Sequence, residues 1–288
     1  MISRQKSFAT DSGKLFLVGT PIGHFDDMSF RAVKTLQEAS VIFAEDTRVT
    51  KVLLSHFHIT TPLRSNHAFN EDVRCAEILG FLRESKHVAI VSDAGMPGIS
   101  DPGYLIAKEA IKEGFDVVCI PGPTAVTTAL AVSGLRIEPF LYAGFLNSRS
   151  SKREKELLLL KDRPETLCFY ESVHRLGPTL SSMRKVLGNR MMALCRELTK
   201  KHEEIIRGPI DEVLPLVLDL KGEFVLVIEG ASKTDSEETR SLTLPQHMDL
   251  YRKQGFDEKE ILKKIASDKN ISKSEVYKEV LTMKGKKE

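Results

Sequence analysis

Three loops rich in glycine and proline are the segments of this 288-residue chain whose residue types could do chemistry. They cover residues 19–24 (GTPIGH), 92–103 (SDAGMPGISDPG) and 121–125 (PGPTA). Glycine lets a backbone approach a ligand closely, proline fixes the shape of a loop, and backbone N–H groups can bind a carboxylate. Such loops could hold a small zwitterion.

Acidic residues accompany these loops: Asp93, Asp101 and the pair Glu45 and Asp46. They would suit a positively charged ligand, such as a sulfonium that also carries an ammonium group. The alternative is that each aspartate caps a helix or a turn. Because three such loops occur together, we favour ligand binding. Neither GxGxxG nor GxxxxGK[ST] occurs in the loops, so the main sequence signals for a dinucleotide or a nucleoside triphosphate are missing.

Short apolar runs precede the loops and predict the strands that position them. The runs cover residues 15–18, 41–44, 88–91 and 117–120, and each ends in Gly, Pro or acidic residues. Apolar residues spaced by three to four predict helices over residues 32–39, 75–82 and 105–111. This alternation predicts an α/β domain with a largely parallel sheet, whose strands carry ligand-binding loops at their carboxyl ends.

A second series of elements predicts another α/β domain. Strand-like runs occur at residues 140–145, 166–171, 191–198 and 223–230, with helices around 151–160 and 180–187. The polar stretch 232–241 predicts a linker, because it has no apolar residue to bury. We therefore predict a loose leader (1–13), two α/β domains (14–135 and 136–231), this linker, and a small C-terminal helical unit (242–288).

The C-terminal unit has the pattern of a helix-turn-helix. Ile261, Leu262 and Ile265 form one helical stripe, and the segment from Ile271 to Tyr277 offers a capped start to a further helix. A mild excess of Lys and Arg in this unit is compatible with RNA contact. A solvated helical cap is the alternative.

Composition limits the class of protein. With 41% hydrophobic residues the chain can form two cores, and 42 basic against 40 acidic residues give a net charge of +2, which decides nothing about nucleic acids. The four cysteines, Cys75, Cys119, Cys168 and Cys195, are far apart and three lie in apolar strand-like runs, where a buried reduced thiol is usual. We expect a reducing, cytoplasmic setting.

The sequence predicts neither an export signal nor a membrane span. The N-terminal residues are polar where a signal peptide needs an apolar core. The uncharged run 117–135 is interrupted by PGP at 121–123, which favours a buried strand, a turn and a buried helix over a membrane helix.

Seven segments resemble the tetrapyrrole methylase family, and within it the enzymes that methylate small-subunit ribosomal RNA. They are GTPIGHFDDMS, AEDTRVTKVLL, SDAGMPGISDPG, PGPTA followed by SGL, YESVHR, RELTKKHEEIIRG and GEFVLVIEG, in family order between Lys14 and Gly230. The C-terminal unit resembles the family's helix-turn-helix extension loosely. The chain departs from the expected pattern at His24, Met96, Thr124 and Val173, and only Met96 lies in the central cofactor loop.

The resemblance implies a two-domain class III methyltransferase that binds S-adenosylmethionine between its domains. It also implies a homodimer that acts on 16S ribosomal RNA in the assembled small subunit, transferring a methyl group to the 2'-oxygen of a cytidine in the decoding region. No metal is expected. Cofactor binding is carried over to these residues: Pro21, Asp93, Ala94, Gly95, Pro97, Gly98, Ser100, Asp101, Pro121, Gly122, Pro123, Thr124, Ala125 and Tyr170.

Methyl transfer needs alignment of the acceptor oxygen in a dry cleft, and a positioned base helps. Candidates for the base are Glu45, Asp46, Glu171 and His174, each expected at a strand end facing the cleft, and Arg48 and Arg175 lie in the same motifs. His174 has the most suitable ordinary pKa, although a role in capping a helix is equally open. The histidines at 56 and 58 lack partners with metal-ligand spacing, so a helix end is the better interpretation.

Basic residues outside the cofactor loops are candidates for RNA binding: Arg149, Arg153, Arg196, Lys200 and Lys201. Residues 149–163 contain six basic and three acidic side chains, a net +3. A solvated helix face remains the alternative for this run.

Other functions stay open at the level of sequence. The first is a related methylase with a small-molecule or protein substrate. A second is a ribosome assembly factor whose cofactor pocket has lost catalysis. A third, a nucleotide-binding dehydrogenase, is weakened by the missing glycine fingerprint.

Overall fold

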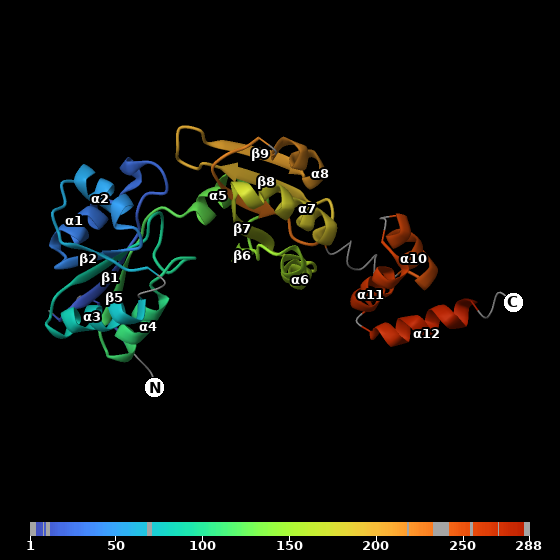
Figure 1. Ribbon diagram of the computed structural model, residues 1–288, viewed down its shortest axis with the longest axis horizontal. Coiled ribbons are helices and arrows are strands. Elements are labelled where there is room, and N and C mark those ends of the chain that lie inside the picture. Colours follow the sequence, from blue (N-terminus) through green and yellow to red (C-terminus); the bar gives the residue numbers. More distant parts are fainter. Residues whose placement is uncertain are drawn as a thin grey trace.

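A computed structural model describes residues 4–7, 9, 12–67, 71–217, 219–232, 242–253, 256–269 and 271–284. Two α/β halves and a C-terminal helical unit follow one another along the long axis (Figure 1). The predicted fold class is confirmed. Residues 233–241 of the predicted linker and part of the predicted leader lie outside the described residues.

The first half is built on a five-stranded parallel sheet in the order β3-β2-β4-β1-β5. Its strands are β1 (Lys14–Val18), β2 (Val41–Ala44), β3 (Leu63–Ser65), β4 (Val88–Val91) and β5 (Asp116–Ile120). Four of them match the predicted apolar runs. β3 was not predicted, because its three residues, LRS, contain no apolar run.

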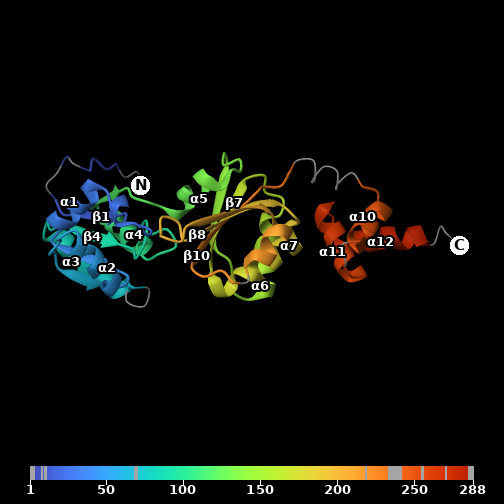
Figure 2. The same ribbon diagram turned by 90° about the horizontal axis from the view of Figure 1, so that it is seen from above.

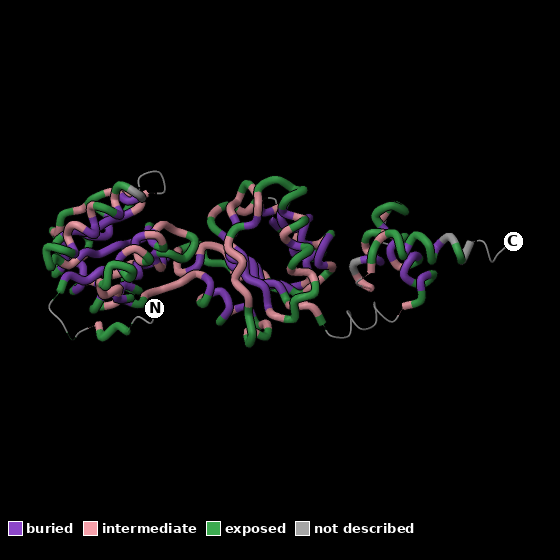
Figure 3. Tube along the Cα trace, turned by 90° about the horizontal axis from the view of Figure 1, so that it is seen from below, coloured by how far each residue is buried: buried purple, intermediate pink, exposed green. Residues whose placement is uncertain are grey.

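Helices cover both faces of this sheet. α1 (Phe30–Glu38) and α2 (Thr47–His56) pack on one face, with the short 3₁₀ helix η1 (Phe25–Asp27) before α1. The opposite face is covered by α3 (Glu71–Arg83) and α4 (Tyr104–Lys112). Alternate strand residues serve the two cores: Ile42 faces α1 and α2, whereas Phe43 faces α3 and α4. The buried strands are visible inside a shell of partly exposed helices (Figure 3).

The second half is built on a mixed sheet in the order β6-β7-β10-β8-β9. β6 and β7 are parallel and the other pairs are antiparallel. The strands are β6 (Phe140–Phe145), β7 (Thr166–Ser172), β8 (Met191–Arg196), β9 (Glu204–Pro209) and β10 (Glu223–Ile228). Strand β9 was not predicted, because it lies within a segment dominated by charged residues.

One face of the second sheet packs on α6 (Ser150–Leu160), α7 (Leu176–Leu187) and α8 (Ile210–Val213), with the 3₁₀ helices η2 (Val173–Arg175) and η3 (Leu214–Val217). The other face packs on α5 (Ala125–Ser133). Both ribbon views place α5 with the second half (Figure 1, Figure 2). The predicted boundary at residue 135 assigns this helix to the first domain, but its buried residues Val126, Ala129 and Leu130 contact the second sheet.

The C-terminal unit consists of α10 (Leu244–Lys253), α11 (Glu258–Asp268) and α12 (Lys273–Lys284). Ile261 and Ile265 are fully buried in its core. The predicted capped start is present: Ser272 Oγ accepts from the Glu275 N–H at 3.3 Å, and Glu275 Oε2 accepts from the Ser272 N–H at 2.7 Å.

Three of the four cysteines, Cys75, Cys168 and Cys195, are buried. Cys119 is exposed, so the expectation of a buried thiol is wrong at this position. It lies on β5, an edge strand, where Val118 and Ile120 face the core and Cys119 points to the other side. Throughout the described part of the chain, the helices are too short or too polar to cross a bilayer.

Candidate active site

The three glycine- and proline-rich loops converge at the carboxyl edge of the first sheet. β1 and β4 are neighbours, but the chain leaves them toward opposite sides of the sheet, so their loops flank a topological switch point. Thr20 and Gly95 connect the first two loops through paired backbone hydrogen bonds of 2.9 and 3.1 Å. A Cβ on Gly122 would lie 2.9 Å from the Gly19 carbonyl carbon, so only glycine permits this approach of the third loop.

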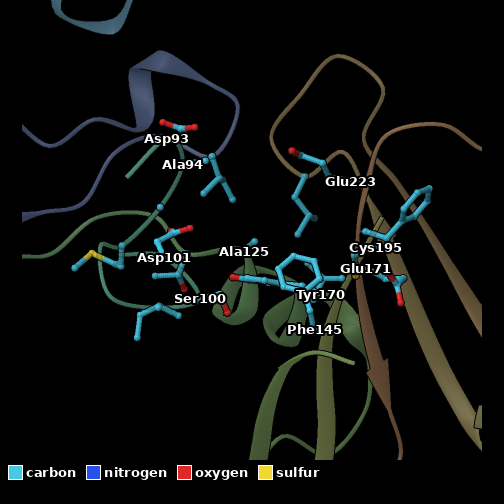
Figure 4. Close-up of a pocket in the computed structure, with 18 of the residues that line it drawn as sticks. Asp93, Ala94, Ser100, Asp101, Ala125, Phe145, Tyr170, Glu171, Cys195 and Glu223 are labelled. Atoms are coloured by element: carbon cyan, nitrogen blue, oxygen red, sulfur yellow. The ribbon is translucent and has the colours of Figure 1, made fainter. Parts of the chain in front are cut away.

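A cavity of about 420 Å³ opens between these loops and the second half. In Figure 4, Asp93, Ala94 and Asp101 of the first half lie opposite Tyr170, Glu171 and Glu223 of the second. Loops of the first half and strands of the second therefore contribute to one site.

Eight of the predicted cofactor residues line this cavity: Asp93, Ala94, Gly95, Ser100, Asp101, Thr124, Ala125 and Tyr170. Six others do not line it and belong to the same loops: Pro21, Pro97, Gly98, Pro121, Gly122 and Pro123. Sequence reasoning missed several lining residues, among them Ile22, Ile99, Phe145, Phe224 and Val225. Ile22 and Ile99 lie within the predicted loops, whereas Phe145, Phe224 and Val225 lie on strands, and apolar side chains of this kind carry no chemical signal in a sequence.

Three carboxyl groups gather on the first-half side of the cavity. Burial, and next the charges of Glu45 and Asp93, raise the pKa of Asp101 to about 6. The pKa of Glu45 is also raised, by burial and then by Asp93. Burial likewise raises the pKa of Asp93, whose Oδ1 accepts from the Asp46 N–H at 2.9 Å. Mutual repulsion of these groups would be relieved by a cationic ligand.

Aromatic side chains form part of the opposite wall. The Tyr170 ring lies edge-on to Tyr142 at 5.1 Å and to Phe145 at 5.5 Å between centroids. Ser100, which has a left-handed φ of 64°, bonds the Tyr142 hydroxyl at 2.6 Å. This bond connects the loop after β4 to strand β6, so it fixes the two halves against each other at the cavity.

Glu171 lines the cavity, yet its carboxylate is occupied by neighbours. Its Oε2 accepts from the Thr179 hydroxyl at 2.6 Å, and its Oε1 accepts from the Ser172 N–H at 2.8 Å and lies 3.2 Å from Arg175 Nε. Arg175 also donates to the Leu146 carbonyl. The Glu171 residue is 2% exposed, so this group holds β6, β7 and α7 together.

Three other predicted catalytic residues do not line the cavity, namely Asp46, Arg48 and His174. Arg175 does not line it either, because it points into the Glu171 cluster. Asp46 caps α2 and pairs with Arg48 at 2.6 Å, and the hydrogen bonds from Arg48 lower the pKa of Asp46 to about 2. An aspartate with that pKa is a poor base near neutral pH.

The predicted RNA-binding residues lie in different environments. Arg149 and Lys201 are exposed, and Arg196 pairs with Glu204 at 3.0 Å. Lys200 lines the cavity, with its Nζ 2.7 Å from Glu223 and 3.1 Å from Glu197.

The surroundings of Arg153 do not agree with its predicted role in RNA binding. It is 4% exposed and donates to Ser182 Oγ and to the carbonyls of Ser148 and Pro178. It connects α6 to α7, and a buried guanidinium with these partners is not available to RNA phosphates.

Within the described residues, no three His, Cys, Asp or Glu side chains converge in a way that could hold a metal ion. The groups that line the cavity are carboxylates, hydroxyls, aromatic rings, apolar side chains, the Cys195 thiol and the Lys200 ammonium.

Comparison with known proteins gives one family and a consistent set of relatives. Residues 14–214 match the family described as Tetrapyrrole (Corrin/Porphyrin) Methylases. The chain is 46% identical to "Ribosomal RNA small subunit methyltransferase I" of Bacillus subtilis, over 96% of this chain and 98% of the relative. A protein of the same name from Thermotoga maritima is also 46% identical, over 76% of this chain and 99% of the relative.

Solved structures share the fold at low identity. A uroporphyrin-III-C-methyltransferase from Thermus thermophilus superposes with a TM-score of 0.55 at 20% identity, covering 78% of this chain and 98% of that one. A diphthine synthase gives 0.58 at 12% identity, covering 76% and 90%.

Proposed function

The chain belongs to the tetrapyrrole methylase family and is a methyltransferase, and from that premise we propose that it transfers a methyl group from S-adenosylmethionine to the 2'-oxygen of a cytidine in small-subunit 16S ribosomal RNA. The proposal includes the decoding region as the target, a homodimer as the acting form, and the cytoplasm as its location. The observation that carries it is the acidic, partly aromatic cavity formed where loops and strands of both halves meet.

The cavity suits the methyl donor of the family. Its volume of about 420 Å³ falls within the range of small-molecule sites. Gly95, with a φ of +82°, lets the loop backbone face the cavity, and Asp93 and Asp101 offer negative charge to a sulfonium and an ammonium group. Tyr170 and Phe145 offer apolar surface. When bound, S-adenosylmethionine supplies a methyl group on a positively charged sulfur.

The protein's contribution to the reaction is placement and water exclusion. The Thr20–Gly95 bridge joins two loops of the first half, and the Ser100–Tyr142 bond ties one of these loops to the second half, so a ribose oxygen would enter a preformed site. We assign removal of the 2'-hydroxyl proton to Glu45. It lines the cavity, burial raises its pKa toward a useful range, and no Lys or Arg is paired with it among the described residues.

The ribosomal substrate is supported by the names of relatives that match nearly the whole chain. The similarity to the first of them extends across 96% of this chain, whereas the family match ends at residue 214. Lys200 at the cavity edge and the exposed Lys201 and Arg149 offer positive charge to RNA.

The proposal is tested by incubating the protein with methyl-labelled S-adenosylmethionine and unmethylated small subunits, followed by nuclease digestion and mass spectrometry. Label on a cytidine 2'-oxygen in the decoding region is the expected result. Glu45→Gln should lower kcat far more than it weakens cofactor binding, to which Glu45 contributes only as one charge of the carboxyl cluster. Cofactor binding without labelling of subunits or naked RNA would reject RNA as the substrate.

A further inference from the structure

A second hollow lies on the far side of the second half from the cavity, between α7 and the C-terminal helical unit. It has a volume of about 1050 Å³. We call it the junction groove and define it by the end of α6, the C-terminal half of α7, and helices α10 and α11. In Figures 1 and 2 the helical unit stands beside α7 and away from the first half. The groove is therefore separate from the methyl-transfer cavity.

The helical unit is joined to the second half by a partly buried polar contact. Lys161 Nζ, at the end of α6, lies 3.2 Å from Asp268 Oδ1 of α11, and Asp268 is 8% exposed at its side chain. The other Asp268 oxygen accepts from the Tyr251 hydroxyl and lies 3.5 Å from the buried His247. These contacts bring residues of both parts together along the groove.

Basic side chains from several elements line the groove. Six basic and four acidic residues contribute to it in total. Two acidic ones are already paired, Asp211 with Arg184 and Asp268 with Lys161. Lys185 of α7 pairs with Glu154, which lies outside the groove lining.

Lys264 of α11 differs from these neighbours. Among the described residues no carboxylate lies within 4 Å of its Nζ, which stands 4.1 Å from the centroid of the Phe256 ring and 5.2 Å from that of Tyr251. Burial, and next the charge of Lys161, lower the pKa of Lys264, although Asp268 and Glu260 act in the opposite direction. An added anion would stabilise the charged form of an ammonium group in this position.

We propose that the junction groove binds the phosphodiester backbone of the RNA substrate, with Lys264 and Lys185 as its principal phosphate contacts. The groove is larger and more polar than a small-molecule site, and its lysines are spread over α7 and α11, which suits an extended polyanion. Lys264, seated on two rings, has little side-chain freedom left to lose on binding. The inference rests on the proposed function, because it names the surface that would hold the same substrate.

The test compares Lys264→Glu and Lys185→Glu with Lys278→Glu in the full-length protein. Lys278 lies on α12 of the same helical unit, is exposed, and does not line the groove. Binding of unmethylated small subunits is measured as a function of salt. Each groove variant should bind about tenfold more weakly, and the slope of log K against log salt should fall by about one, while Lys278→Glu stays near wild type. Cofactor affinity should be unchanged in all three.

A folding control and two contrary outcomes complete the test of the junction groove. Lys185→Glu, on a helix of the second half, guards against loss of the helical unit in Lys264→Glu, and limited proteolysis checks that the unit remains folded. Wild-type affinity and slope in both groove variants would overturn the proposal while leaving the methylation assay positive. If wild-type protein neither binds nor methylates the subunit, the proposed function fails and the groove proposal fails with it.

Discussion

The cavity and the junction groove carry opposite charge. The cavity, about 420 Å³, is bordered by three carboxyl groups whose pKa values are raised by burial, whereas the groove, about 1050 Å³, contains a lysine whose pKa is lowered by burial. A small cation and an extended polyanion are therefore suited to separate surfaces. Helix α7 connects the two, because Thr179 at its start holds Glu171 and Lys185 near its end lines the groove.

The largest effect is expected at the cavity loop. Gly95→Val should reduce cofactor affinity by roughly 100-fold, because a β-branched residue is strongly disfavoured at a φ of +82° and its side chain would point toward Ile22. Isothermal titration calorimetry measures the change. Gly80→Ala is the matched control, since a Cβ there meets no atom within 4 Å. Affinity close to wild type for Gly95→Val would remove this loop from the cofactor site.

Glu171→Ala tests whether the contacts of Glu171 with Arg175 and Thr179 stabilise the packing of α7 on the second sheet. Removing one partner of this buried pair should lower the free energy of unfolding by about 3 kcal/mol, and Thr179→Val by about 1 kcal/mol. Urea unfolding measures both. Glu84→Ala, which loses an exposed pair with Lys86, should change stability little. A catalytic base at Glu171 would instead show lost turnover with unchanged stability.

The carboxyl groups of the cavity should make cofactor affinity depend on pH. Asp101→Asn should weaken cofactor binding by about tenfold near neutral pH. In wild type, affinity should fall as pH drops through about 6, because a cation prefers ionised Asp101. The neutral amide of the variant does not titrate, so the substitution should reduce this dependence.

The stability of the cofactor-free protein should change in the opposite direction. The pKa of Asp101 is raised from 3.8 to about 6 on folding, so its contribution to stability is full below about 3.8 and is lost as pH rises through about 6. Thermal unfolding of wild type and Asp101→Asn across this range compares the two. If wild type and Asp101→Asn share one pH profile for cofactor binding and one for unfolding, Asp101 does not belong to the charge cluster.

The smallest effect is expected for salt acting on the cavity. Raising salt from about 50 to 200 mM should change cofactor affinity less than about twofold, whereas affinity for the small subunit should fall at least about tenfold. Calorimetry and filter binding on one protein preparation give both values. A steep salt dependence for the cofactor would break the contrast between the two surfaces.

Much of the fold followed from local patterns. The strands β1, β2, β4 and β5 are apolar runs that stop at Gly, Pro or acidic residues, and the capping box at Ser272 is readable from its spacing. The three-residue strand β3 and the charged strand β9 lack such a pattern. The partner of α5 was beyond a local pattern, since periodicity predicts a helix but not the sheet on which it packs.

The site was predictable to the extent that its residues are chemically unusual. The glycine- and proline-rich loops were recognisable and do converge, but apolar lining residues such as Phe145 and Val225 were not. Arg153 was misjudged because its neighbours are charged, while its burial depends on Ser182, 29 residues away. His174 has a suitable side chain type, yet it lies in the 3₁₀ helix η2 after β7 and outside the cavity lining.

The position of α5 has a mechanical consequence. Strand β5 belongs to the first sheet and α5 packs on the second, so the main chain passes from one half to the other through residues 121–124. Any rotation of one half against the other must twist this segment, which contains two prolines and ends at Thr124 in the cavity wall. The segment that joins the two halves therefore reaches the cavity at Thr124, so a ligand bound against Thr124 would resist rotation of one half against the other.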